Sequence, residues 1–423
     1  MSSILIRGGS RLNGSVRVQG SKNSTLPVMA ASLLNRGITV IRNYPDIADV
    51  QVMQEILEYI GCTVYRENDE MVIDTRNAEY RPIPTEIAVK LRASSILMGP
   101  MLSRFTKVQI APPGGCLIGA RPLDIHMEAF ERLGAYWENS EKEITVTARR
   151  LVGNQMTLRF PSVGATENAI MAAVCAEGET VIKNAALEPE IIQLCNYLRA
   201  AGADISDDGA NEIMISGVRH LHDCEYTVAA DRIVAGTYIA AVAACGGKVQ
   251  LQGCTVNDCT GYLDVYTGMG VDFDCNEDGI MVQMTKRPQN LNYIVTEPYP
   301  KFPTDMQSIT LSVATISEGT LKIYENIFEN RFKIVDSLKK MGAQVSMLGS
   351  QCAEVTGVAH INGAEVEAAD LRGAAALVIA GLCADGITRV NNTDYIRRGY
   401  ADLVENLRKL GAEIQWEYNE RKN

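Results

Sequence analysis

One short pattern divides the 423-residue chain into six units of similar length. At six places an apolar residue, a glycine and a small or apolar residue end a helix-like stretch, and successive glycines lie 68 to 73 residues apart. They are Gly61, Gly134, Gly202, Gly270, Gly342 and Gly411. A glycine in this position is typical of the residue that follows a helix. A period of about 70 residues therefore indicates a repeated fold.

Each unit shows the same order of predicted elements. An alternating strand, such as residues 15–18 or 293–295, precedes a helix that is apolar nearly all round. A β-rich run, an amphipathic helix such as 50–60, the glycine and two short strands follow, so the unit is βαβαββ. A helix without a polar face belongs inside a core. Such helices are predicted at 26–34, 96–102, 170–176, 233–244, 309–316 and 374–384.

The sixth unit ends before its last strand. The N-terminal residues 4–9 resemble residues 353–358, which end the fifth unit, so we expect the N-terminal strand to complete the sixth. The prediction is an α/β protein with two domains, each of three βαβαββ units around buried helices. The first domain is predicted to span 22–229, and the second 1–21 and 230–423.

The overall composition excludes several classes of protein. With 40 basic against 51 acidic residues, the net charge of −11 argues against binding nucleic acid or an anionic membrane through net charge. The longest apolar stretch, 373–384, is shorter than the ~18 residues that span a bilayer, and we expect no signal peptide. Eleven scattered cysteines predict reduced thiols in the cytoplasm. The four histidines show no metal-ligand spacing, so no metal site is expected.

Cations recur in the turn before the apolar helices, at Lys22, Arg92, Arg232 and Arg372. A helix N-terminus favours anions and disfavours cations, so capping alone does not explain them. Polar residues at the same turns, such as Asp370, can be ordinary N-caps. The recurring cations predict a shared anion site that faces both domains.

A second set of polar residues lies in the loop before the amphipathic helices. Residues 112–124 hold three glycines, three prolines, Cys116 and Arg121, a composition typical of a mobile lid. Arg331 and Arg398 occupy the corresponding loops of later units. Arginines bind phosphate and carboxylate, so an anionic small substrate is predicted. Cys116 can also be an ordinary loop or core cysteine, and Arg331 and Arg398 can be surface ion pairs.

Six motifs together resemble one enzyme family. They are Gly-Ser-Lys-Asn at 20–23, the segment 113–122, the segment 162–168, Phe-Pro-Thr-Asp-Met-Gln at 302–307, Phe-Glu-Asn-Arg at 328–331 and Arg-Gly-Tyr at 398–400. On these motifs the chain resembles, end to end, the UDP-N-acetylglucosamine 1-carboxyvinyltransferases, which are enolpyruvyl transferases. The resemblance implies two inside-out α/β domains that close on substrate.

The implied activity is transfer of enolpyruvyl from phosphoenolpyruvate to the 3′-hydroxyl of UDP-N-acetylglucosamine. Phosphate is released by addition and elimination through a tetrahedral ketal, in the first committed step of peptidoglycan synthesis. The implied partners are these two small molecules, with no metal or organic cofactor. The family cysteine is also expected to capture the epoxide fosfomycin.

Residue roles follow from the resemblance alone. Cys116 is the acid that protonates C3 of phosphoenolpyruvate and can form an adduct with it, and Asp305 is the base near the sugar hydroxyl. Lys22, Arg121 and Arg398 hold phosphate and carboxylate, and Asp370 and Arg372 occupy positions near the reacting centre. The residues implied to bind the nucleotide sugar are Asn23, Arg92, Arg121, Pro122, Leu123, Asp124, Ile125, Ser162, Val163, Gly164 and Ile327.

Two residues depart from the family pattern. Phe160 stands where some members have a lysine near the uridine diphosphate, so one phosphate contact is expected to differ. Arg397 stands where some members have an acidic residue, and we expect it to add positive charge at the mouth of the site.

Three other interpretations remain open from the sequence. The 5-enolpyruvylshikimate-3-phosphate synthases share the sixfold plan, but the loop around Cys116 and the 302–307 motif favour the nucleotide-sugar enzyme. The RNA 3′-phosphate cyclases use a histidine nucleophile, and no histidine lies at a repeated loop position. The third interpretation is a paralogue that has lost catalysis. The presence of Lys22, Cys116, Asp305 and Arg398 argues against it.

Overall fold

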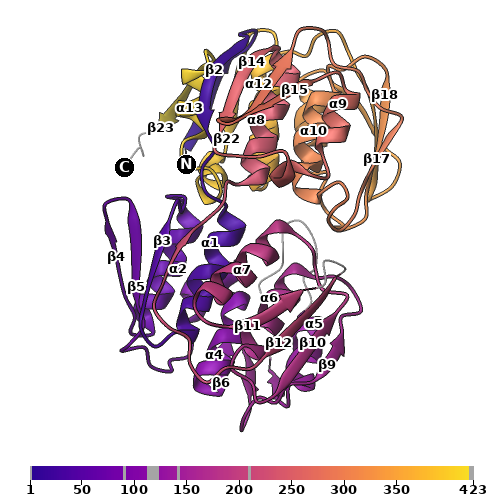
Figure 1. Cartoon of the computed structure of the whole chain (residues 1–423). Coiled ribbons are helices and arrows are strands. Elements are labelled where there is room, and N and C mark those ends of the chain that lie inside the picture. The colour runs from indigo at the N-terminus through magenta and orange to yellow at the C-terminus, as the bar shows by residue number, and fades with distance from the viewer. Residues whose placement is uncertain (1, 89–91, 112–122, 141–142, 208–210, 419–423) are drawn as a thin grey trace. The chain divides into compact units, whose positions relative to one another are not determined.

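The computed structural model describes residues 2–88, 92–111, 123–140, 143–207 and 211–418, which form two compact units (Figure 1). The first domain runs from Gly20 to Ala229, and the second contains the N-terminal residues up to Gln19 and those from Ala230 onward. Residues 20 and 21, which the sequence analysis assigns to the second domain, thus belong to the first. The reason is that Ser21 caps helix α1 (Lys22–Ala31) and donates its N–H to the Ala229 carbonyl at 2.8 Å.

The repeated glycines end helices as predicted. All six have a positive φ, between 88° and 105°, a conformation that costs energy for residues with a Cβ. The helices that they follow are α2 (Ala48–Tyr59), α5 (Asp124–Arg132), α7 (Pro189–Ala200), α9 (Leu263–Gly268), α11 (Val335–Lys340) and α13 (Leu403–Lys409). The sixfold repeat is therefore confirmed.

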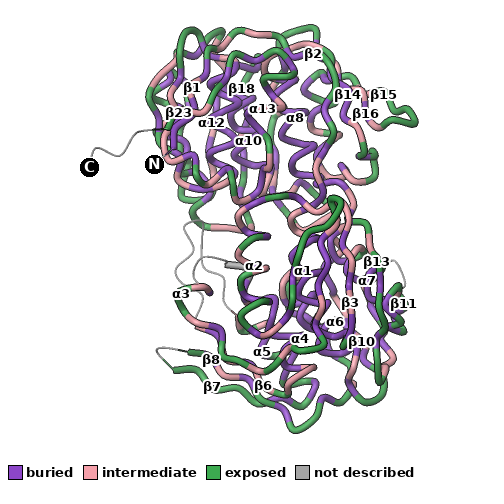
Figure 2. The backbone as a smooth tube through the Cα atoms, turned by 90° about the vertical axis from the view of Figure 1, so that its left-hand side faces the viewer, coloured by how far each residue is buried: buried purple, intermediate pink, exposed green. Residues whose placement is uncertain are grey.

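The apolar helices form the interior of each domain (Figure 2). In the first domain they are α1 with η1 (Ser32–Leu34), η2 (Arg92–Leu97) with α4 (Met98–Phe105), and α6 (Val163–Ala173). In the second they are α8 (Arg232–Cys245), α10 (Gln307–Ala314) and α12 (Leu371–Cys383), which pack on one another. Every residue of α10 is buried. Helices thus lie inside and sheets outside, which confirms the inside-out α/β fold.

The five four-stranded sheets of the described residues share one arrangement of strands. The first two strands of each four-stranded sheet are parallel, and the remaining contacts are antiparallel. Four of these five sheets have the orders β13 (Cys224–Thr227), β3 (Ile38–Arg42), β5 (Glu70–Asp74), β4 (Thr63–Glu67); β9 (Gln155–Thr157), β10 (Glu179–Lys183), β12 (Glu212–Ser216), β11 (Asp204–Asp207); β2 (Leu12–Arg17), β14 (Gly247–Gln252), β16 (Gly279–Met284), β15 (Asp272–Asn276); and β17 (Tyr293–Thr296), β18 (Thr320–Glu325), β20 (Cys352–Thr356), β19 (Gln344–Met347).

Two strands are exchanged between the first and fourth units. Strand β2 precedes α1 in the sequence but pairs with β14, with Val16 opposite Leu251. Strand β13 precedes α8 but pairs with β3, with Tyr226 opposite Ile41. Assigning each strand to the helix that follows it is therefore wrong in these two units. The chain passes from one domain to the other directly after β2 and directly after β13, so each strand stays in the domain that the chain leaves.

The second unit lacks its first strand in the part of the chain that the structure describes. Its sheet has the order β6 (Lys107–Ile110), β8 (Ile144–Thr147), β7 (Tyr136–Asn139), with the short helix α3 (Thr85–Ala88) before it. Ile83 donates its N–H to the Gln109 carbonyl at 3.3 Å, but Pro82 and Pro84 on either side have no N–H to donate. The predicted common plan is therefore wrong for this unit.

The N-terminal strand completes the sixth sheet. Strand β1 (Ser2–Arg7) lies between β22 (Ile387–Asn391), which also pairs with β21 (Glu365–Glu367), and β23 (Glu413–Tyr418). Ile4 lies opposite Val390 on one side and Trp416 on the other. The pairing is the one that the sequence predicts. None of the helices in the described ranges is both long and apolar enough to cross a membrane.

Candidate active site

A carboxylate lies between two buried guanidinium groups in the second domain. Arg372 Nη2 donates a hydrogen bond to Asp305 Oδ2 at 2.9 Å, and Arg331 Nη2 donates one to Oδ1. The arginines are 4% and 2% exposed, whereas the Asp305 side chain remains 29% exposed. The three formal charges sum to +1. Because Arg331 is buried, its interpretation as a surface ion pair is wrong.

Three different elements bring these residues together. Asp305 belongs to the turn η4 (Thr304–Met306), which leads directly into α10. Arg372 lies in the first turn of α12, and Arg331 lies in the connector between β18 and α11. Two of the three are thus held at the ends of buried helices, whose packing fixes their position.

The charges keep Asp305 ionised. Burial by itself would raise the pKa of Asp305, but Arg372 and Arg331 outweigh burial and hold that pKa well below its usual range. Burial likewise opposes the charge of Arg372, and Asp305 reverses the effect and raises the Arg372 pKa. Asp305 is therefore a permanent hydrogen-bond acceptor and a weak base.

Tyr400 and Gln19 fix the segment that follows Arg398. The Tyr400 hydroxyl lies 3.3 Å from Arg372 Nη1 and 2.9 Å from the Thr237 hydroxyl on α8. Gln19 donates its Nε2 to the carbonyl of residue 399 at 3.1 Å and accepts the N–H of residue 401 at 2.9 Å. Arg398 itself is the last residue of η5 (Thr393–Arg398). A glutamine that follows a strand has no local signal, so the sequence analysis missed Gln19.

Two predicted site residues act as N-caps. Ser162 accepts the N–H of Ala165 at 3.4 Å, and Asp370 Oδ1 accepts the N–H groups of Arg372 and Gly373 at 3.0 and 2.9 Å. The capping explanation therefore holds for both. Asp370 Oδ2 is buried and has no hydrogen-bond partner among the described residues, so it remains available as an acceptor.

Lys22 forms an ion pair in the first domain. Its Nζ lies 2.5 Å from Oδ2 of Asp49, which is in the first turn of α2, and the two side chains are 12% and 4% exposed. Asn23 follows Lys22 on α1. Asp49 is not predicted from the sequence, because an acidic residue in the first turn of a helix is common and is explained by the helix dipole alone.

A buried network supports the segment Ser162–Gly164. Asn168 Nδ2 lies 3.1 Å from each of three acceptors, the Ser95 and Gly164 carbonyls and His126 Nδ1. Its Oδ1 accepts the N–H of Gly99 at 2.6 Å. A Cβ on Gly164 would lie 3.2 Å from His126 Cε1, so the ring packs closely against this backbone. Val163 and Gly164 form the first turn of α6.

The N-terminus of α5 carries the next predicted set. Leu123 is the N-cap residue, and Asp124 Oδ1 accepts the N–H of Ile125 at 2.9 Å. Asp124 also pairs with Arg159. Phe160 beside it is 43% exposed. Arg159 thus lies next to Phe160, the position at which some members of the resembled family have a lysine.

Several predicted residues are not tested by the structure. Cys116, Arg121 and Pro122 lie outside the described residues, as does the side chain of Arg92. Ile327 is described, and its N–H donates to Glu325 Oε1 at 2.9 Å.

Arg397 lies on an aromatic pair. Its guanidinium is 4.7 Å from the centre of the Trp416 ring, and its Nη2 donates to the Tyr418 hydroxyl at 3.0 Å. The two rings are stacked on β23. The charge of Arg397 is therefore held against this strand.

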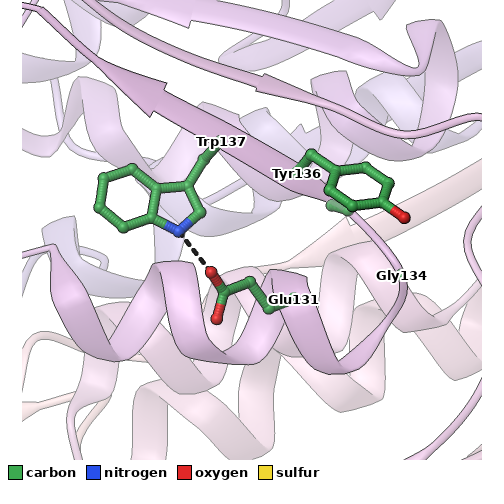
Figure 3. Close-up of a pocket in the computed structure, with 5 residues that line it drawn as sticks. Glu131, Gly134, Tyr136 and Trp137 are labelled. Atoms are coloured by element: carbon green, nitrogen blue, oxygen red, sulfur yellow. Dashed lines mark hydrogen bonds between the residues drawn. The ribbon is translucent and has the colours of Figure 1, made fainter.

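A surface hollow of about 300 Å³ lies elsewhere, at the end of α5 (Figure 3). It is lined by Glu131, Gly134, Ala135, Tyr136 and Trp137, and the Trp137 indole donates to Glu131 at 2.7 Å. No predicted site residue lines it, so it is not the candidate active site. Within the described ranges, no cluster of three or more His, Cys, Asp or Glu side chains could hold a metal ion.

Comparison with known proteins identifies the family. A family model described as EPSP synthase (3-phosphoshikimate 1-carboxyvinyltransferase) matches residues 6–419. The chain is 45% identical over 414 residues to UDP-N-acetylglucosamine 1-carboxyvinyltransferase 2 of Caldanaerobacter subterraneus subsp. tengcongensis, covering 98% of this chain and 99% of that one. It is 42% identical over 411 residues to UDP-N-acetylglucosamine 1-carboxyvinyltransferase of Corynebacterium efficiens, covering 97% of both chains. This chain belongs to the UDP-N-acetylglucosamine 1-carboxyvinyltransferase family.

Solved structures agree with this membership. The enolpyruvyl transferase NikO from Streptomyces tendae is similar with a TM-score of 0.88 at 25% identity, covering 98% of this chain and 99% of that one. EPSP synthase from Acinetobacter baumannii has a TM-score of 0.75 at 18% identity, which shows the shared fold alone. The enolpyruvyl transferase fold is thereby confirmed. The much higher identity to the nucleotide-sugar enzymes favours them over the EPSP synthases.

Proposed function

We propose that this family member transfers enolpyruvyl from phosphoenolpyruvate to the 3′-hydroxyl of UDP-N-acetylglucosamine and releases phosphate. The observation that carries the proposal is identity of 42–45% over nearly the whole chain with relatives named for this reaction. The product, the enolpyruvyl ether of UDP-N-acetylglucosamine, would then be used in peptidoglycan synthesis. We also infer a cytoplasmic enzyme, because the cysteines of the described ranges are free thiols, as a reducing compartment favours.

The charges of the described residues suit two anionic substrates. The centre of Asp305, Arg331 and Arg372 has a net charge of +1 and both of its guanidinium groups are buried. Buried arginines stay ionised, and their field is screened little by water. Together with Lys22 and Arg398, these groups would bind phosphate and carboxylate and stabilise the charge of the tetrahedral intermediate.

The reaction balances with two acid–base groups. The 3′-oxygen of the sugar bonds to C2 of phosphoenolpyruvate while Cys116 delivers a proton to C3, which gives the ketal. The bond from C2 to the phosphate oxygen then breaks, and C3 returns a proton to the Cys116 thiolate to form the enolpyruvyl ether. The proton that Asp305 takes from the sugar hydroxyl leaves with the phosphate. A cysteine thiol in a model peptide has a pKa of about 8.5 and keeps its proton at neutral pH, which suits the acid role given to Cys116.

Asp305 would orient the sugar hydroxyl. Because its pKa is held low by Arg372 and Arg331 against the effect of burial, it accepts a hydrogen bond at any physiological pH. It would take the proton only as the forming C–O bond makes the hydroxyl oxygen acidic. This order makes proton transfer concerted with attack.

Phosphate release tests the proposal. The purified chain is incubated with phosphoenolpyruvate and UDP-N-acetylglucosamine, and in a parallel reaction shikimate 3-phosphate replaces the nucleotide sugar. Release only with the nucleotide sugar is expected, and release only with shikimate 3-phosphate would assign the EPSP synthase reaction. Cys116→Ala should lose activity and fosfomycin labelling, whereas Cys275→Ala, an exposed cysteine, should keep both. Full activity of Cys116→Ala would remove the role given to that thiol.

A further inference from the structure

Glu325 is a fully buried carboxylate that the sequence analysis did not select. It is the last residue of β18 and is 0% exposed. A buried carboxylate is costly unless its oxygens accept hydrogen bonds. Oε2 accepts the Thr304 hydroxyl at 2.9 Å, and Oε1 accepts the N–H groups of Ile327 and Phe328 at 2.9 and 3.0 Å. Both oxygens are therefore engaged.

The partners of Glu325 belong to the segments that carry the proposed site. Thr304 directly precedes Asp305 in η4. Ile327 and Phe328 lie in the connector between β18 and α11, which also contains Arg331. The main chain of Glu325 is held as well, because its N–H donates to the Gln351 carbonyl at 2.8 Å and its carbonyl accepts Gln351 Nε2 at 3.0 Å. Glu325, held by both its main chain and its side chain, thus links η4 to the connector.

The hydroxyl of Thr304 transmits the position of Glu325 to Arg331. A hydroxyl has one hydrogen, and a carboxylate can only accept, so Thr304 must donate toward Glu325. Its lone pairs then face Arg331, whose Nε lies 3.3 Å from Oγ1. Arg331 in turn donates through Nη2 to Asp305. The direction of every bond in the series from Glu325 to Asp305 is therefore determined.

We propose that Glu325 is a positioning residue for the transfer reaction. Through Thr304 it orients the Arg331 guanidinium and hence Asp305, and through Ile327 and Phe328 it holds the connector. It does not touch the reacting atoms. The proposal rests on the proposed function for its kinetic consequence. Displacing such a positioned group by about 1 Å can cost roughly 100-fold in rate.

Substitutions separate positioning from simple stabilisation. Glu325→Gln keeps the shape but replaces one acceptor oxygen by a donor, and Thr304→Val removes the hydroxyl at nearly constant volume. Thr304→Ser keeps the hydroxyl and is the conservative variant. Glu354→Gln, which alters a half-exposed ion pair with Lys322 on the same sheet, is the control.

Kinetics of phosphate release give the main test. Glu325→Gln and Thr304→Val should each lower kcat by roughly 10- to 100-fold, and the double variant should be no slower than the worse single one. Thr304→Ser and Glu354→Gln should stay within about threefold of the parent. Tryptophan fluorescence of Trp416 confirms that each variant is folded. If Glu325→Gln does not fold, Thr304→Val decides, and a folded Thr304→Val with parental kcat overturns the proposal.

Amide hydrogen exchange tests the anchoring without turnover. In Glu325→Gln, residues 326–331 should exchange at least about tenfold faster than in Glu354→Gln. If the parent releases no phosphate, the proposed function fails, and the exchange comparison still decides whether Glu325 holds the connector. Equal exchange in the two variants would overturn the positioning role.

Discussion

His126 should make the first domain sensitive to acid. Its ring is 6% exposed on α5, and burial lowers its pKa to about 4, which the carboxylate of Asp124 only partly offsets. The Asn168 amide is oriented by its bonds to Gly99 and Gly164, so its nitrogen faces His126 Nδ1, and an amide nitrogen can act there only as a donor. Protonating Nδ1 would place two donors against each other. The folded state therefore requires a neutral ring.

The size of the effect follows from linkage. A histidine in the unfolded chain has a pKa of about 6.5, so between about pH 6.5 and pH 4 the unfolded state binds more protons than the folded state. The free energy of unfolding then falls as the pH falls. The His126 contribution drops by about 2 kcal/mol from about pH 7.5 to pH 5, and by about 3 kcal/mol once the pH is below 4.

Urea unfolding measures this dependence in one domain. The chain has two tryptophans, and Trp416→Phe leaves Trp137 as the reporter of the first domain. In this background His126→Gln should be less stable than the parent at about pH 7.5, and the difference should narrow by about 2 kcal/mol at pH 5. His220→Gln, at an exposed site, is the control and should follow the parent. An unchanged difference between His126→Gln and the parent across this range would refute the reasoning.

Three further changes test other parts of the structure. Ile6→Ala removes a fully buried side chain of β1 and should destabilise the second domain by about 2–5 kcal/mol, measured by Trp416 fluorescence. Arg7→Ala changes a side chain that is 60% exposed and should cost under about 1 kcal/mol. Equal effects of the two substitutions would contradict the central place of β1 in its sheet. Asp49→Asn removes the carboxylate partner of Lys22 and should cost the first domain about 3 kcal/mol by Trp137 fluorescence, so unchanged stability would argue against a buried ion pair. Asp305→Asn should lower kcat roughly 100-fold, and since its pKa is depressed, the parent should lose no activity through Asp305 protonation down to about pH 5. If the parent loses activity on acidification above about pH 5, and Asp305→Asn does not show this loss, the assignment is contradicted.

The elements that the sequence predicts are those fixed by local chemistry. A glycine at positive φ ends each amphipathic helix because the strain of a Cβ is local to that residue. The apolar helices were predicted because a helix with no polar face has only the core in which to lie. The N-terminal strand was placed by internal similarity, since residues 4–9 repeat the pattern of 353–358.

The same local logic fails where the chain changes domain. Strands β2 and β13 stand before buried helices like any other first strand, and nothing in their residues shows that they pair with β14 and β3. The second unit differs from these two, because its missing first strand in the described residues could be predicted locally. Pro82 and Pro84 have no N–H to donate to a neighbouring strand.

The sequence by itself determined the sixfold plan, the buried helices, the family resemblance and the recurrence of cations at helix starts. Only the tertiary structure decided which of these charges meet. Asp305 lies 26 residues from Arg331 and 67 from Arg372, and Lys22 meets Asp49 from a different helix. Helix ends depend on neighbouring residues in the chain, whereas an ion pair depends on distances that only the packed core sets. Glu325 is the clearest case, because its burial and the three hydrogen bonds that its side chain accepts exist only once η4 and the connector have folded around β18.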